Sequence, residues 1–96
     1  MIYVAAARMN FRVSNDHYLK EKRSILNSIN AKVKNKFNVS VIEAEELDNH
    51  KSIVLGLSAV SSSKDIAAET IRKVADFILS NFDVELTQEE TYIDNL

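Results

Sequence analysis

The hydrophobic pattern of this 96-residue chain predicts an α+β domain in which two helices cover one face of a four-stranded antiparallel sheet. Strand-like alternation near the N-terminus, two later helix-like stripes and the order of these patterns all point to that class. The length suits a single domain over residues 1–96. Apolar residues make up 46% and charged residues 27%, the balance of an ordinary soluble globular protein.

The first predicted element is a strand over residues 2–13. Every odd position from Tyr3 to Val13 is apolar, whereas the even positions turn polar from Arg8 onward. Alternation with a period of two predicts a strand that packs on a core through one face. Ser14-Asn15-Asp16 then offers the short polar side chains of a turn or a helix cap.

A helix is predicted next, because from Leu19 to Phe37 the apolar positions follow three- and four-residue spacings, into which Lys22 also falls. We expect Asn38 to end this helix, since asparagine tolerates the left-handed conformation. Residues 39–45 and 51–60 have the composition of strands, with Asp48-Asn49 as the turn between them. The single glycine, Gly56, is expected to mark a bulge or a close approach of two backbones.

A second helix is predicted after Ser62, which we expect to form a partial capping box with Asp65. Its buried stripe consists of Ala67, Ile71, Val74, Ile78 and Phe82. A last strand follows from Val84 to Ile93, its pattern blurred by Gln88-Glu89-Glu90. The resulting order, strand-helix-strand-strand-helix-strand, is that of the split βαβ or ferredoxin-like fold.

Charge is divided unevenly along the chain, although the formal net charge is only −2. Residues 8–36 carry a net +6 and residues 37–96 a net −8. Such a division creates a directional field around the molecule. The candidate residues for binding nucleic acid or another anion are Arg8, Arg12, Lys20, Lys22, Arg23, Lys32, Lys34 and Lys36.

Two interpretations of these bases are open. In one they meet phosphates, with Arg8 and Arg12 extending the surface onto the sheet face that the helices leave uncovered; in the other they solvate a helix and pair with acids elsewhere. Lys20, Lys22 and Arg23 open the first helix, where each cation opposes the helix dipole by about 0.3–1 kcal/mol. This cost indicates a use for them, either a bound anion or acidic partners in the second half of the chain.

No catalytic site is predicted. With no cysteine, one glycine and only His17 and His50 as histidines, the chain lacks thiolate chemistry, sulfur-ligated metal sites and glycine-rich phosphate loops. The acidic runs at residues 43–48 and 83–94 lack the shaped loop that Ca²⁺ needs, which favours solvated edge strands. An RNA-recognition motif carries stacking aromatics on the sheet face where this chain is expected to carry Arg8 and Arg12, so an orthodox motif of that kind is excluded. We expect no enzyme, no cofactor and no metal.

Nothing in the sequence approaches the roughly 18 consecutive apolar residues of a membrane span. The N-terminus lacks the basic region of a secretory signal. We therefore expect a cytoplasmic protein with no membrane partner.

One segment resembles a known family. His17-Tyr18-Leu19-Lys20-Glu21-Lys22-Arg23 is similar to the His-Ser-Leu-Lys-Glu-Lys-Arg signature of the YlxP-like family of small bacterial proteins, a domain of unknown function. The likeness continues through Phe37-Asn38-Val39-Ser40-Val41 and then at Glu43, Asp48, Gly56 and Val60-Ser61. Tyr18 stands where serine is usual, and His50 where the family often has tryptophan. The resemblance implies a ferredoxin-like fold and a gene neighbourhood among translation and ribosome-maturation factors, but no catalytic residue.

Two functions of different classes follow as hypotheses. The first is a non-enzymatic module that associates with ribosomal RNA or ribosomal particles through the basic first helix, with salt-sensitive binding. The second is a homodimer or protein-partner domain whose open sheet face, bearing Arg8 and Arg12, forms the interface. A sensor for an anionic small ligand is a third, weaker alternative.

Overall fold

The computed structural model describes residues 1–13, 19–45 and 51–96. Its elements are β1 (Tyr3–Val13), α1 (Leu19–Lys36), β2 (Ser40–Glu45), β3 (Ser52–Ser61), α2 (Lys64–Asn81) and β4 (Val84–Asn95). This order confirms the predicted ferredoxin-like α+β fold. The turns expected at residues 14–16 and 48–49, and both histidines, lie outside the described residues.

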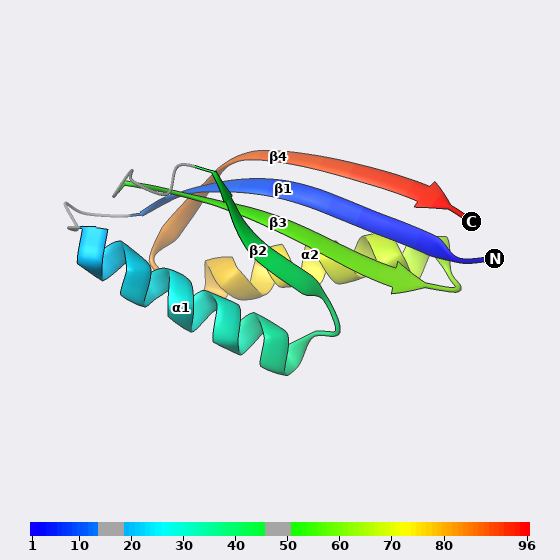
Figure 1. Ribbon diagram of the computed structural model, residues 1–96, viewed down its shortest axis with the longest axis horizontal. Coiled ribbons are helices and arrows are strands. Elements are labelled where there is room, and N and C mark those ends of the chain that lie inside the picture. The colour runs from blue at the N-terminus through cyan, green and yellow to red at the C-terminus, as the bar shows by residue number, and fades with distance from the viewer. Residues whose placement is uncertain (14–18, 46–50) are drawn as a thin grey trace.

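The four strands form one antiparallel sheet in the order β2-β3-β1-β4 (Figure 1). The two longest pairings join β1 to β3 and to β4, so β1 lies inside the sheet and β2 and β4 form its edges. The ends of the chain lie side by side: the Ile2 N–H donates to the Leu96 carbonyl at 3.0 Å, and the Leu96 N–H donates back to the Ile2 carbonyl at 2.8 Å.

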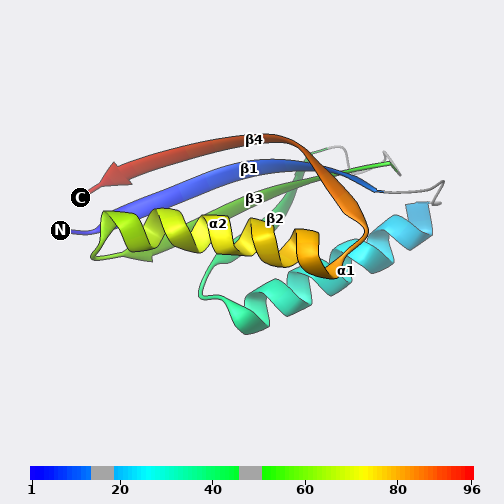
Figure 2. The same ribbon diagram turned by 180° about the vertical axis from the view of Figure 1, so that it is seen from behind.

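Both helices lie on one face of the sheet, as the two opposite views show (Figures 1 and 2). The odd-numbered residues of β1 point into this layer, where Met9 and Phe11 have no exposed surface. Ile29 of α1 and Ile78 of α2 are equally buried on the helix side. Full burial of side chains of this size contributes about 1.5–3 kcal/mol each. The alternation in β1 is therefore the pattern of a strand with one covered face and one open face.

The blurred pattern of β4 has a structural cause. The register of β4 against β1 shifts between Asn10 and Phe11, so that Thr87 is the extra residue of a bulge. Its hydroxyl donates to the Asn10 carbonyl at 3.1 Å. Before the bulge Leu86 faces the core opposite Phe11, and after it Ile93 does so opposite Ala5. One inserted residue moves the apolar positions from even to odd numbers.

Two local predictions are corrected or made specific by the structure. The N-cap of α2 is Ser63, not Ser62: its side-chain oxygen accepts from the Ile66 N–H at 3.3 Å. Gly56 itself lies in regular register, opposite Ile42 and Arg8, so it marks neither a bulge of its own strand nor a close approach of two backbones, but a place where a side chain from β2 crosses β3. A Cβ added there would stand 3.1 Å from Cγ1 of Ile42, which crosses over the glycine from β2.

Candidate functional site

The basic residues predicted as a binding site separate into three groups in the structure. Arg8 and Arg12 lie on β1, on the face of the sheet opposite the helices. Arg23 lies in the first turns of α1, whereas Lys32, Lys34 and Lys36 lie in its last turns. With a rise of about 1.5 Å per residue, Arg23 and Lys36 stand roughly 20 Å apart along the helix. The side chain of Lys20 falls outside what the structure describes.

Lys22 differs from the expectation that it faces solvent with its basic neighbours. Its side chain has no exposed surface, and its Nζ lies 3.4 Å from Oε2 of Glu43, whose side chain is 14% exposed. The physical reason is position: Lys22 falls on the apolar stripe of α1, and Glu43 falls on the covered face of β2, opposite Leu55. A buried charge needs a partner of opposite sign. Lys22 thus joins α1 to β2 and is withdrawn from any surface that meets phosphates.

Arg8 and Arg12 are exposed, but each faces an acid across the sheet. Arg8 lies opposite Glu90 in the register, with Nη1 to Oε1 at 3.8 Å and both side chains about half exposed. Arg12 lies opposite Glu85. Cross-strand pairs of opposite charge neutralise much of the field that either arginine would present alone. The open face is thereby less attractive to an anionic polymer than the sequence suggested.

The C-terminal end of α1 brings lysines onto aromatic rings of α2 and its flanks. Nζ of Lys36 lies 5.9 Å from the ring centroid of Phe37 and 5.5 Å from that of Phe77. These two rings meet edge to face, with centroids 5.6 Å apart. One turn earlier, Nζ of Lys32 lies 5.4 Å over the ring of Phe82. Contacts of this kind hold an ammonium group near a ring without neutralising its charge.

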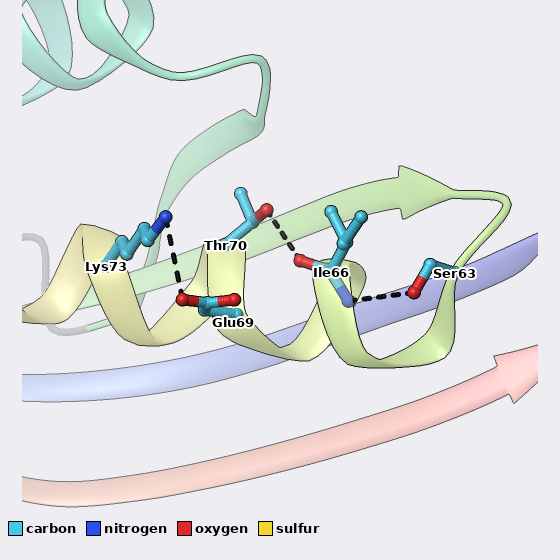
Figure 3. A network of polar contacts seen from close by, with 5 residues as sticks. All are labelled: Ser63, Ile66, Glu69, Thr70 and Lys73. Atoms are coloured by element: carbon cyan, nitrogen blue, oxygen red, sulfur yellow. Dashed lines mark hydrogen bonds and ion pairs between the residues drawn. The ribbon is translucent and has the colours of Figure 1, made fainter.

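Lys73 completes this group from α2. Its Nζ lies 3.6 Å from Oε1 of Glu69 one turn earlier on the same helix (Figure 3). Both side chains are more than half exposed, so this i,i+4 pair is weak. Lys36, Phe37 and Lys73 together line two adjoining pockets between the end of α1 and the face of α2. Lys34 lines a third depression beside them, next to the start of β2.

We call Lys32, Lys34, Lys36 and Lys73 the α1–α2 basic cluster. All four are exposed. Cations in the last turn of a helix interact favourably with its dipole, so Lys34 and Lys36 fit this place structurally as well. The cluster, with half-buried Phe37 and Phe77 between its members, offers phosphate-binding cations and aromatic surface in one region.

Sequence reasoning found three members of this cluster and missed the rest of the site. Lys73 and Phe77 are more than 35 positions from Lys36 in the chain, and only the packing of α2 beside α1 brings them together. The sequence predicts Phe37 as part of the apolar stripe of the first helix and not as part of a binding surface. An aromatic residue directly after a lysine-rich helix end was the available signal.

The open face of the sheet exposes three large apolar side chains, two of them toward the chain termini and the third, Ile42 of β2, in the same cross-strand row as Gly56 and Arg8. Ile42, Val60 and Tyr92 are 59%, 63% and 64% exposed. The Tyr92 hydroxyl donates to Oδ2 of Asp94 at 3.1 Å. This hydrogen bond is the main reason that the pKa of Tyr92 is raised, because the ionised phenolate has no proton to donate. The negative charge of Asp94 raises the pKa further, because it repels the phenolate.

The described part of the chain contains no group of three or more histidine, aspartate or glutamate side chains placed to hold a metal ion. Neither helix, in the residues that the structure describes, is both long and apolar enough to cross a lipid bilayer.

Comparisons with known proteins identify the family. A family model described as "Protein of unknown function (DUF503)" matches residues 4–91. The "Uncharacterized protein YlxP" of Bacillus subtilis is 40% identical over 73 residues, which cover 76% of this chain and 79% of that protein. Among solved structures, the de novo designed protein Foldit4 superimposes with a TM-score of 0.53 at 13% identity, covering 100% of this chain and 99% of the other. That likeness concerns the fold alone. The chain therefore belongs to the YlxP-like family of proteins of unknown function, DUF503.

Proposed function

We propose that this protein is a non-enzymatic binding module that associates with RNA in ribosomal particles through the α1–α2 basic cluster. The observation that carries the proposal is the placement of Lys36 and Lys73, from two helices, around the rings of Phe37 and Phe77. Phosphates are bound by exposed lysines, and aromatic rings beside them are the usual second component of a surface for RNA. The proposal places the protein in the cytoplasm, with the ribosomes.

The distribution of charge supports the cluster over the other bases. Lys22 is paired inside the protein, and Arg8 and Arg12 face acids on the open sheet. At the end of α1, by contrast, three exposed lysines occur within five residues. On α2, Glu69 pairs with Lys73 of the cluster itself and Asp76 pairs with Arg72, so most of the positive charge of the cluster comes from the three lysines of α1. A small footprint of this kind predicts moderate, strongly salt-dependent affinity.

The experiment is co-sedimentation of the purified protein with ribosomal particles from a bacterial lysate at low and moderate salt. We expect wild-type protein in the particle fraction at low salt and its release at moderate salt. Lys34→Glu/Lys36→Glu is expected to abolish co-sedimentation. The matched control, Arg23→Glu/Lys64→Glu, changes the net charge equally at two exposed sites outside the cluster and is expected to bind as wild type.

Far-UV circular dichroism establishes that both variants fold. Absence of wild-type protein from the particles at low salt would overturn the proposal. Equal loss in both variants would show that overall charge, and not the cluster, governs binding.

A second candidate function, self-association, is favoured by three exposed apolar side chains on the open sheet face. Ile42, Val60 and Tyr92 are large and exposed, and their register places them on the face of the sheet opposite the helices. The four strands are 11, 6, 10 and 12 residues long. With about 3.3 Å per residue and about 4.8 Å between strands, they form a face of roughly 600 Å². A standard interface buries about 800 Å² on each partner. Val54, on the same face, is already fully buried, so a second copy would have to use all of the face that remains exposed. The helices, and with them the basic cluster, would stay accessible in such a dimer.

Light scattering on a size-exclusion column tests this candidate. A dimer requires twice the chain mass of 10.8 kDa at micromolar concentration. Ile42→Lys is expected to return the protein to the monomer mass. Ile66→Lys on α2 is the control, because that isoleucine is 56% exposed against 59% for Ile42 but lies on the helix side. A monomeric wild-type protein would exclude the interface.

A further inference from the structure

We infer that the pocket between the end of α1 and α2 receives an unpaired base, so that the protein selects single-stranded over duplex RNA. The inference rests on the proposed function and specifies its substrate. It concerns the pocket of about 330 Å³ lined by Lys36, Phe37, Lys73 and Phe77 together with Ser80 and Asn81.

Two aromatic rings form the walls of this pocket. Phe37 and Phe77 pack against the hydrophobic core and remain only partly buried. Their edge-to-face arrangement, with planes at 76°, leaves a corner between two ring surfaces. A base that enters such a corner can stack on one ring and meet the edge of the other, which needs no particular base sequence.

Polar groups also line this shallow pocket. Nδ2 of Asn81 donates to the Phe77 carbonyl at 2.8 Å, which fixes the amide at the end of α2 beside the ring. Ser80 lines the pocket next to it. Asp76 also lines the pocket, with Oδ1 3.7 Å from Nε of Arg72, so its charge is partly compensated. Hydroxyl and amide groups of this kind can hydrogen-bond to the edge of a base that has left its stack.

Lys36 connects the pocket to the RNA backbone. Its ammonium group stands over both rings and is exposed, so an entering base displaces it at little cost. The displaced ammonium group and that of Lys73 then flank the pocket, where the phosphates of a nucleotide bound in it would lie. In a duplex the bases are stacked and paired and cannot enter. The duplex can use only the lysines, so it binds more weakly.

The inference is tested by fluorescence anisotropy with a labelled single-stranded RNA, its duplex with the complementary strand, and the mononucleotide AMP. Wild-type protein is expected to bind the single strand at least tenfold more tightly than the duplex. Phe77→Leu keeps an apolar side chain at this partly buried position but removes the stacking surface. It is expected to weaken single-strand binding by about five- to hundredfold and to leave duplex binding unchanged.

Phe82→Leu is the matched control, because Phe82 is another partly buried phenylalanine under a lysine but does not line this pocket. It is expected to bind both RNAs as wild type. Equal affinity for single strand and duplex, or an unchanged Phe77→Leu variant, would overturn the inference and leave the proposed function standing. AMP binding as tight as the single strand would also overturn it, in favour of a free nucleotide. Failure to bind either RNA would contradict the proposed function itself.

Discussion

Two ion pairs on opposite faces of the sheet, Lys22–Glu43 and Arg8–Glu90, have opposite environments. On the covered face Lys22 and Glu43 meet at 3.4 Å with the lysine fully buried, and Oε2 of Glu43 is buried without a hydrogen bond of good geometry. On the open face Arg8 and Glu90 meet at 3.8 Å with side chains 46% and 63% exposed. The covered pair therefore joins α1 to β2 inside the protein, whereas the open-face pair stays in contact with solvent. A basic residue can be assigned to a binding surface only after the structure shows whether its side chain is buried under the helices or exposed to solvent.

The largest expected effect comes from breaking the covered pair. Glu43→Ala leaves the Lys22 ammonium group buried without its carboxylate, which is expected to cost about 3–5 kcal/mol of unfolding free energy. Urea denaturation followed by circular dichroism measures it. Lys22→Met/Glu43→Leu replaces both charges by apolar groups of similar size and is expected to recover most of the loss. If Glu43→Ala were as stable as wild type, that result would contradict the assignment of this pair to the interior.

A much smaller effect is expected on the open face. Arg8→Ala removes one partner of an exposed pair, and the remaining Glu90 is solvated by water, so the unfolding free energy should change by about 0–1 kcal/mol. The same urea titration, repeated at high salt, checks this. We expect the difference between Arg8→Ala and wild type to shrink with salt, because screening weakens exposed pairs. A loss comparable to that of Glu43→Ala would remove the contrast between the two faces.

The smallest effect concerns Tyr92 on the open face. The hydrogen bond to Asp94 raises the pKa of Tyr92, so Asp94→Asn is expected to lower that pKa toward the ordinary value of tyrosine. The folded state holds this proton more tightly than the unfolded state. Its contribution to stability is therefore present below the unfolded pKa and is lost as the pH rises through the folded pKa. Ultraviolet titration, with Tyr92→Phe subtracted to isolate the signal, measures the shift; an unchanged pKa in Asp94→Asn would show that the contact is not formed in solution.

The elements of this fold could be predicted from the sequence because their signals are local. Alternation in residues 2–13 and the stripes of the two helices depend on spacing alone, and the structure confirms all six elements in order. Ser62, Ser63 and their neighbours are equally capable of capping, so the choice of Ser63 required the backbone conformation. The bulge at Thr87 was visible only as a blurred pattern, since its position depends on the register against β1.

The candidate site was less predictable because it is tertiary. Lys22 fits both the apolar spacing and the basic run, and only its contact with Glu43 separates the two interpretations. Lys36 and Lys73 belong to different helices, and no spacing rule relates them. One of the two interpretations of the basic run placed its members on a single surface, whereas the structure separates them into three groups.

The most direct test of this division is an amide NMR titration of the labelled protein with a short single-stranded RNA. We predict chemical-shift changes over Lys32–Asn38 and Lys73–Phe82, at the end of α1 and along the second half of α2, with little change in Arg8, Arg12 and Glu90. The largest changes are expected at Lys36 and Phe77. Changes centred on the open-face residues of β1 and β4 would contradict the account, since they would place the anion-binding surface on the side where the bases face acids.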